Sequence, residues 1–240
     1  ETDAECRDLI GLATARRLTL MVDHTFIYTG AVRKIRDLIR AGELGEIHYF
    51  DSVRVNLGLF QHDVNVIWDL APHDLSIMDF VLPKRPTQVA AHGARHVAGS
   101  QIENIAYITL RFEDETLAHF HVNWLAPAKI RRIIIGGSSK MLVFDDLSPD
   151  EKIKIYDKGL RFQESDDSTM RQVLAGYRTG DMSVPHIEPV EALRREADHF
   201  LECVRTGARP ESDGESGRRV VRVLAAAQES LARNGAFIEL

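Results

Sequence analysis

The strongest constraint on the fold is the strict alternation of apolar and polar residues in two segments, 105–112 and 117–124. A period of two places every second side chain on the same face of a β-strand. Only Glu113 to Thr116 separate the segments, which predicts a hairpin. Its apolar face comprises Ala106, Ile108, Leu110, Phe112, Ala118, Phe120, Val122 and Trp124. Such a face must be buried, so we expect helices to cover it.

Further segments extend this hairpin into a large sheet. Strands are predicted at residues 48–57, 87–96, 130–135, 141–144 and 152–156. Two segments, 72–82 and 189–204, are the expected covering helices. The predicted class is therefore α+β, with a large, mostly antiparallel sheet covered by helices on one face.

The other face of the hairpin is polar and aromatic. It carries Tyr107, Thr109, Arg111, His119, His121 and Asn123. Side chains of this kind are too polar for a dry core, yet they form a flat surface that can meet another sheet. We interpret this face as a subunit interface of a homodimer or homotetramer.

Residues 1–45 differ in pattern from the rest. Thr2 or Asp3 can cap a helix that places Cys6, Leu9, Ile10 and Ala13 on one face. Residues 18–22 predict a buried strand, and a second amphipathic helix runs from Tyr28 to Gly42. Helix, strand and helix in this order are typical of the last part of an α/β unit, which cannot form a domain alone. We therefore divide the chain into residues 1–45 and 46–240, and we expect a long functional loop at 164–185.

Composition excludes several classes of protein. The net charge of −6 is spread along the chain without a basic cluster, so no nucleic-acid partner is expected. No apolar run approaches the roughly 18 residues of a membrane span. Cys6 and Cys203 lie far apart and belong to no Cys/His cluster, which excludes a thiolate zinc site and is typical of a cytoplasmic protein.

The segment Trp68 to Asp74 contains the residues best suited to chemistry. Pro72 fits the first position of a helix, so His73 is predicted in the first turn, where the helix dipole disfavours imidazolium. Asp69 could orient that neutral imidazole. Such a pair can accept the hydroxyl proton of an alcohol while hydride leaves the same carbon. The alternative is that both residues only cap the helix.

Asp69-x-x-x-His73 followed by Asp74 resembles the catalytic signature of the Gfo/Idh/MocA family of oxidoreductases. Residues 22–28 are similar to the family's strand-to-helix passage after its nucleotide-binding sheet, and residues 42–47 are similar to its entry into the second domain. Residues 56–58, 63–74 and 177–181 are similar to the branch that oxidises nucleotide sugars such as UDP-N-acetylglucosamine at C3. The resemblance implies an NAD(P)-dependent sugar dehydrogenase in which Asp69 and His73 are the acid–base pair.

The resemblance also implies a Gly-rich Rossmann turn for NAD or NADP, and a lysine from a Glu-Lys-Pro motif. Neither is in the sequence: Gly136 and Gly137 lie between two predicted strands and are expected to form a hairpin turn. We therefore expect that most of the Rossmann domain is missing and that this chain alone neither binds NAD nor turns over. His24 and Phe26 are implied cofactor contacts, and Asp23 replaces a usual glycine beside them.

Five residues are candidate substrate contacts: Tyr28, Arg54, Asn56, Asn65 and Tyr177. Arg54 and Asn56 have the same parity on one strand, so both can face a cleft. Arg54 suits a diphosphate and Asn56 a sugar hydroxyl or acetamido group. The alternative for Arg54 is an ion pair with a carboxylate.

Two other functions compete with this prediction. One is metal-dependent chemistry, because His62, Asp63, Asp69, His73 and Asp74 lie close in sequence and His119-x-His121 places two imidazoles on one strand. Arg111 on the same sheet face argues against a metal at the second pair. The other is a non-catalytic oligomerising module, which follows if the dinucleotide-binding domain is absent.

Overall fold

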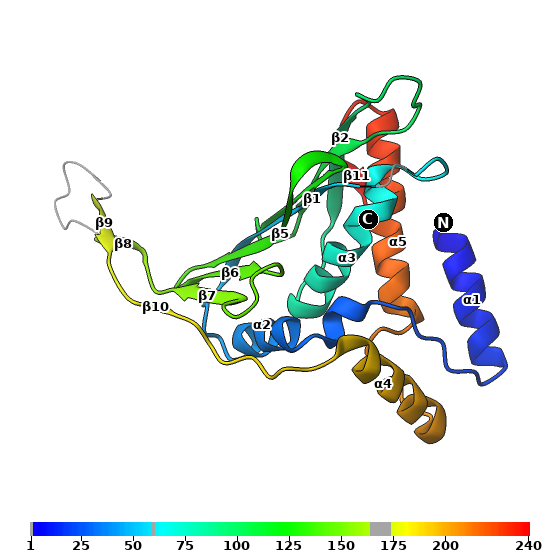
Figure 1. Cartoon of the computed structure of the whole chain (residues 1–240), viewed down its shortest axis with the longest axis horizontal. Coiled ribbons are helices and arrows are strands. Elements are labelled where there is room, and N and C mark those ends of the chain that lie inside the picture. The colour runs from blue at the N-terminus through cyan, green and yellow to red at the C-terminus, as the bar shows by residue number, and fades with distance from the viewer. Residues whose placement is uncertain (1, 59–60, 164–173) are drawn as a thin grey trace.

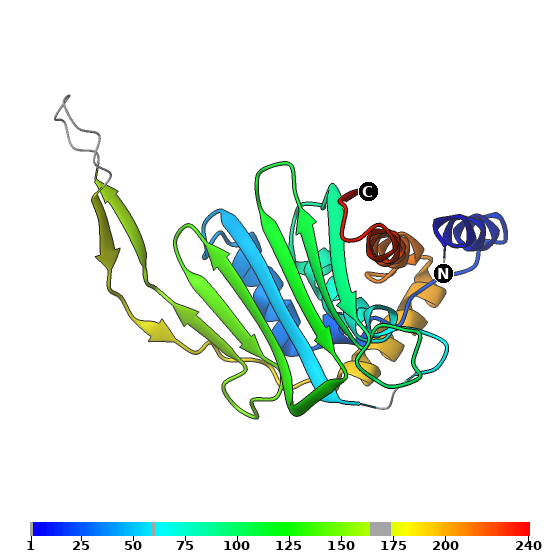
Figure 2. The same cartoon turned by 90° about the horizontal axis from the view of Figure 1, so that it is seen from above.

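The protein is described by a computed structural model that covers residues 2–58, 61–163 and 174–240. Within these residues nine strands form one sheet in the order β10-β7-β6-β5-β1-β4-β3-β2-β11 (Figures 1 and 2). The strands are β1 (Ile47–Leu57), β2 (Gln88–Ala94), β3 (Ile105–Arg111), β4 (Leu117–Asn123), β5 (Leu125–Gly137), β6 (Met141–Asp145), β7 (Ile153–Tyr156), β10 (Met182–Ser183) and β11 (Ile238–Glu239). All neighbouring pairs are antiparallel except β1 and β4, so the predicted mostly antiparallel sheet is confirmed.

The hairpin of β3 and β4 forms the centre of the core. Ile108 lies opposite Phe120 and Leu110 opposite Ala118, and all four side chains are buried. Cross-strand apolar neighbours of this kind stabilise the sheet, and burial of a side chain such as Phe120 contributes roughly 1.5–3 kcal/mol. The predicted apolar face is confirmed.

Helices α3 (Val66–Val81) and α5 (Gly214–Ala232) cover this buried face, as Figure 2 shows. Helix α5 packs against β2 and α3 through an apolar stripe of helical spacing that contains Val220, Val223, Leu224 and Ala227. The prediction that residues 189–204 cover the sheet was wrong. The helix there, α4 (Ala192–Thr206), packs instead against the short helix η1 (Thr25–Tyr28), and its Leu201 is 64% exposed.

The N-terminal segment contains the predicted helices but not the predicted strand. Helix α1 (Asp3–Ala15) begins with a capping box between Thr2 and Glu5 and packs against α5. Helix α2 (Gly30–Arg40) is followed by Gly42, which has a positive φ of 72°, as the predicted end requires. Residues 18–22 are not a strand: Met21 forms a single bridge with Asp213. An apolar run becomes a strand only when a neighbouring strand offers its backbone, and none lies beside this run in the described chain.

The predicted loop at 164–185 was also partly wrong. Residues 164–173 lie outside the described residues, but strands β8 (Gly159–Gln163) and β9 (Leu174–Arg178) form a two-stranded hairpin, and β10 pairs with β7. This hairpin projects from the body of the molecule in both views (Figures 1 and 2). In the described part of the chain no helix is long and apolar enough to cross a membrane.

Candidate active site

Helix α3 begins six residues earlier than the sequence predicted. The side chain of Asn65 accepts hydrogen bonds from the backbone N–H groups of Ile67 and Trp68 at 3.1 and 3.3 Å. This cap starts the helix at Val66 and leaves Pro72 inside it. His73 therefore lies in the third turn, and the prediction that it lies in the first turn was wrong.

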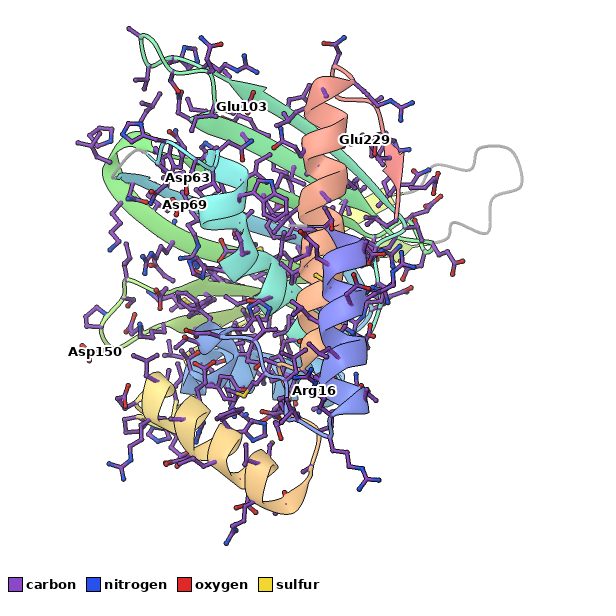
Figure 3. All side chains as sticks on the ribbon, turned by 90° about the vertical axis from the view of Figure 1, so that its right-hand side faces the viewer. Arg16, Asp63, Asp69, Glu103, Asp150 and Glu229 are labelled. Carbon is purple, nitrogen blue, oxygen red and sulfur yellow. The ribbon has the colours of Figure 1, made fainter. Side chains whose placement is uncertain are left out.

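Asn65 also ties the start of α3 to the rest of the core. Its amide nitrogen donates to Glu103 at 3.0 Å and to Gln228 on α5 at 2.7 Å. Figure 3 labels Glu103 and Asp69 near this end of the helix. The residue is buried and both of its polar atoms are occupied, which counts against the predicted contact between Asn65 and a substrate.

Asp69 and His73 lie four residues apart on α3 and therefore on the same face of the helix. The indole Nε1–H of the buried Trp124 donates a 2.7 Å hydrogen bond to Oδ2 of Asp69. The side chain of His73 is exposed. The carboxylate is thus anchored, whereas the imidazole is open to a ligand.

The surroundings of His73 favour its neutral form. Loss of hydration among the neighbouring groups lowers its pKa, and the positive charge of Arg54 lowers it further, while Asp74 acts in the opposite direction. The sequence predicted a neutral imidazole from the helix dipole. The structure gives the same direction for a different reason, because His73 is far from the first turn.

Arg54 does not face an open cleft. Its side chain is 4% exposed and forms a two-point ion pair with Asp74, with Nε–Oδ2 at 3.0 Å and Nη2–Oδ1 at 2.6 Å. Ser52 donates a third hydrogen bond to the same carboxylate at 2.7 Å. This geometry counts against a diphosphate contact and agrees with the alternative of an ion pair, although the pair is buried.

Phe26 connects this ion pair to His73. The guanidinium carbon of Arg54 lies 4.7 Å from the centre of the Phe26 ring. The same ring makes a T-shaped contact with His73, with the ring centres 5.4 Å apart and the planes at 65°. Phe26 is therefore in contact with the candidate base, and its predicted role beside a cofactor stays a prediction.

The end of β1 reaches the same region. Asn56 is half-buried, and a Cβ atom at Gly58 would lie 3.0 Å from its Nδ2 atom and 3.4 Å from Cδ1 of Trp124. The N–H of Gly58 donates to the carbonyl of Trp124 at 3.2 Å. These contacts put Asn56 near the tryptophan that holds Asp69, and it stays a candidate substrate contact.

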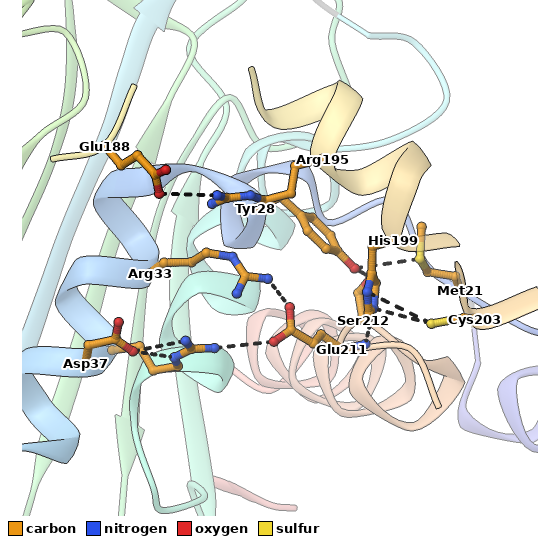
Figure 4. A network of polar contacts seen from close by, with 11 residues as sticks. Met21, Tyr28, Arg33, Asp37, Glu188, Arg195, His199, Cys203, Glu211 and Ser212 are labelled. Atoms are coloured by element: carbon orange, nitrogen blue, oxygen red, sulfur yellow. Dashed lines mark hydrogen bonds and ion pairs between the residues drawn. The ribbon is translucent and has the colours of Figure 1, made fainter. Parts of the chain in front are cut away.

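Tyr28 lies apart from this region, in the network of Figure 4. Its ring is fully buried, its hydroxyl lies 2.8 Å from Oγ of Ser212, and the ring packs 5.6 Å from His199 on α4. This placement counts against the predicted substrate contact. Tyr177 belongs to β9, opposite Leu160, and its side chain is outside the described part of the structure.

His24 caps η1 without a side-chain hydrogen bond. Its Nε2 atom is buried and has no hydrogen-bond partner in the described residues, and burial lowers its pKa to about 4. The ring lines a cavity together with Arg36, Ser76 and Asp79. Its predicted contact with a cofactor is untested.

The turn at Gly136 and Gly137 does not have the form of a phosphate cradle for a dinucleotide. Gly136 and Gly137 end β5 and lead into β6, as the predicted hairpin turn requires. A Cβ atom at Gly136 would overlap the ring of Tyr49, and one at Gly137 would overlap the carbonyl of Leu44. The atoms of Tyr49 and Leu44 therefore lie directly against these two glycines.

Three features of the region were missed by the sequence analysis. They are the bond from Trp124 to Asp69, the Ser52–Asp74–Arg54 cluster and the contact of Phe26 with His73. The shared parity of Ser52 and Arg54 was a usable signal. Among the residues that the structure describes, no three His, Cys, Asp or Glu side chains come together in a way that could hold a metal ion.

Residues 32–143 match the model of the GFO/IDH/MocA C-terminal domain. The chain is 24% identical over 246 residues to the uncharacterized oxidoreductase YrbE of Bacillus subtilis, covering 92% of this chain and 64% of that protein. It is 27% identical over 238 residues to UDP-N-acetylglucosamine 3-dehydrogenase of Acidithiobacillus ferrooxidans, covering 98% and 68%. The chain thus spans about two thirds of the length of these relatives.

Solved structures share the fold. The A. ferrooxidans enzyme superposes with a TM-score of 0.77 at 22% identity, covering 96% of this chain and 68% of that chain. An inositol dehydrogenase homolog from Azotobacter vinelandii, complexed with NADH and myo-inositol, superposes with a TM-score of 0.78 at 16% identity, covering 100% and 69%.

Proposed function

We propose that the chain belongs to the Gfo/Idh/MocA family of oxidoreductases, whose C-terminal domain model matches residues 32–143, and that the complete gene product oxidises a CH–OH group of a sugar or nucleotide sugar with NAD or NADP. Asp69 and His73 are the proposed acid–base pair. The observation that carries this proposal is an exposed imidazole whose surroundings disfavour its charged form, on the same helix face as an anchored carboxylate.

The proposed proton chemistry follows from these two side chains. The neutral imidazole of His73 accepts the proton of the substrate hydroxyl as the carbon–oxygen double bond forms. Asp69, held by Trp124, lies on the same face and stabilises the imidazolium that results. When bound, the nicotinamide supplies the acceptor for the hydride that leaves the carbon.

A nucleotide sugar is the proposed substrate class. The relative that matches 98% of this chain is named as a UDP-N-acetylglucosamine 3-dehydrogenase. Asn56, half-buried beside the tryptophan that holds Asp69, offers an amide that can bond to a sugar hydroxyl or an acetamido group. With Arg54 occupied by Asp74, contacts to a diphosphate are expected from other residues.

We further propose that the dinucleotide is bound by a domain outside these 240 residues. Support comes from the turn at Gly136 and Gly137, which is packed against Tyr49 and Leu44, and from the greater length of the relatives. Fluorescence titration of this chain with NADH is expected to give no saturable binding. With that result, the 240 residues alone would be a non-catalytic module. Tight binding would contradict this proposal.

The open face of the sheet is the proposed subunit interface. Tyr107 is 43% exposed there and stacks on His121 with ring centres 4.5 Å apart. Exposed aromatic side chains on a flat face are typical of interfaces between protein copies. Light scattering after size-exclusion chromatography is expected to give the molar mass of a homodimer or homotetramer. The Tyr107→Glu variant is expected to shift the molar mass toward that of the monomer.

Turnover of the complete gene product tests the proposed activity. Reduction of NAD or NADP is followed at 340 nm with UDP-N-acetylglucosamine, myo-inositol and free hexoses. Turnover with at least one of them is expected, and it should be lost in Asp69→Asn. Asp63→Asn is the matched control, because Asp63 is an exposed aspartate close in sequence. Loss of activity in both variants, with stoichiometric zinc in the purified protein, would favour metal-dependent chemistry instead.

A further inference from the structure

Helix α3 carries two aspartates that each hold an arginine at two points. Asp74 binds Arg54 of β1, and Asp79 binds Arg219 of α5 at 2.8 and 2.7 Å. The two pairs differ in their surroundings. The side chains of the first pair are both 4% exposed, whereas the Arg219 side chain is 33% exposed.

The pair of Arg54 and Asp74 is connected to His73 through the ring of Phe26. The guanidinium of Arg54 lies over one face of Phe26, a position that attracts the cation to the ring. The same ring makes a T-shaped contact with His73. The contacts thus run from Asp74 to Arg54, then to Phe26 and to His73. They form a ring of four residues, because His73 and Asp74 are neighbours on α3.

A buried ion pair is a costly way to stabilise a fold. Desolvation of both charges offsets most of their attraction, and apolar residues of the same volume often stabilise a protein as well. Here Ser52 satisfies one further lone pair of the Asp74 carboxylate, so the arrangement is fixed at three points. Its orientation places a permanent positive charge and a rigid ring beside the candidate base.

We propose that Arg54 is a positioning residue for His73: it holds Phe26 against the imidazole and places a fixed positive charge beside it. The inference rests on the proposed function of His73 as the base. Arg54 itself does not touch the substrate.

Other titratable groups among the described residues also act on His73. Asp69 and Asp74 come from its own helix, Arg131 from β5, and the imidazole of His24 from the segment before η1. Arg54 and Arg131 lower the pKa of His73, while the two carboxylates raise it, and the effect of Arg54 is larger than that of Asp74. Removal of Arg54 is therefore expected to raise this pKa.

NMR titration of the histidines in the 240-residue chain tests the inference without any turnover. The His73 signal is assigned from its absence in His73→Gln. Arg54→Met is expected to shift the His73 titration to higher pH, because the positive charge that lowers its pKa is removed. Arg54→Lys keeps the charge and is expected to restore most of the wild-type value. Arg219→Met, which breaks the pair at Asp79, is the matched control and should leave the His73 titration unchanged.

Two further variants complete the test: a double variant guards against misfolding, and Phe26→Leu removes the ring contact with His73. Because Arg54→Met leaves the Asp74 carboxylate buried and unpaired, the double variant R54M/D74N is made in parallel and is expected to show a smaller rise in the same direction. Phe26→Leu keeps the ion pair and is expected to broaden the range of His73 ring conformations. An unchanged His73 pKa in the folded double variant and in folded Arg54→Met would overturn the inference.

Kinetics of the complete gene product separate this inference from the proposed function. Arg54→Met should move the acidic limb of the kcat profile to higher pH with little change in KM. A large rise in KM for a nucleotide sugar but not for a free sugar would instead make Arg54 a diphosphate contact. If His73→Gln keeps full activity while Arg54→Met still shifts the His73 titration, the proposed function fails and the positioning role stands.

Discussion

Glu196→Gln is expected to remove a large part of the pH dependence of folding. Glu196 lies on α4 where this helix packs against η1, and it is 6% exposed. Neither of its carboxylate oxygens has a hydrogen-bond partner in the described residues. Burial raises the pKa of Glu196 from 4.5 to about 7. The Thr25 hydroxyl, which lies close to the carboxylate but outside hydrogen-bonding geometry, opposes the change, and the nearby Asp23 carboxylate adds to it.

The sign and size of the effect follow from linkage. The folded protein holds a proton on Glu196 that the unfolded chain releases above pH 4.5, so the free energy of unfolding falls as pH rises from about 4.5 to about 7. Above pH 7 both states are ionised and the loss is complete. At 1.36 kcal/mol per pKa unit, the loss reaches about 3 kcal/mol. Glutamine has the same shape and cannot ionise, so the variant should not lose this stability.

Urea unfolding followed by circular dichroism between pH 4.5 and 8 measures the difference. Relative to its value at pH 4.5, the variant should gain about 3 kcal/mol over wild type by pH 8. Glu202→Gln is the control, because Glu202 lies on the same helix with a side chain that is 51% exposed. The lowered pKa of His24 favours folding as pH rises, but it acts equally in all three proteins and cancels. Parallel curves for wild type and Glu196→Gln would refute the reasoning.

Three further changes test the local structure around the site. Trp124→Phe removes the hydrogen-bond donor that holds Asp69 and should lower the free energy of unfolding by about 1–3 kcal/mol in urea. An unchanged free energy of unfolding would mean that this hydrogen bond does not stabilise the fold. Asn65→Ala removes the cap of α3 and should cost about 1–2 kcal/mol in the same assay, whereas Asn65→Asp should keep the cap and lose the amide donor. Gly137→Ala should lower the melting temperature, because its Cβ would overlap the Leu44 carbonyl, and an unchanged melting temperature would show that the turn can shift.

The sheet was predictable from sequence because the signal is local. Strict alternation in 105–124 fixes which side chains share a face, and cross-strand contacts such as Ile108 with Phe120 follow from a short hairpin. The helices that cover the sheet were harder to predict from sequence, because α4 and α5 both have an apolar stripe. Which of them packs on the sheet depends on the path of the chain.

The start of α3 was misplaced because two local signals compete. Pro72 suits a first turn and costs about 3 kcal/mol inside a helix. In the structure that cost is outweighed by the Asn65 cap and by the burial of Val66 and Ile67. Parity on β1 predicted that Arg54 faces a cleft, but the side chain is buried against Asp74. That partner is 20 residues away, and its position is set by the rotation of α3.

The central claim is that His73 acts as the base of a sugar dehydrogenase, and kcat of His73→Gln in the complete gene product tests it most directly. The variant keeps the side chain's hydrogen-bonding capacity but cannot accept a proton at neutral pH. The account predicts that NAD(P) reduction falls roughly 10²–10⁴-fold while His62→Gln retains wild-type turnover. Wild-type turnover in His73→Gln would contradict it.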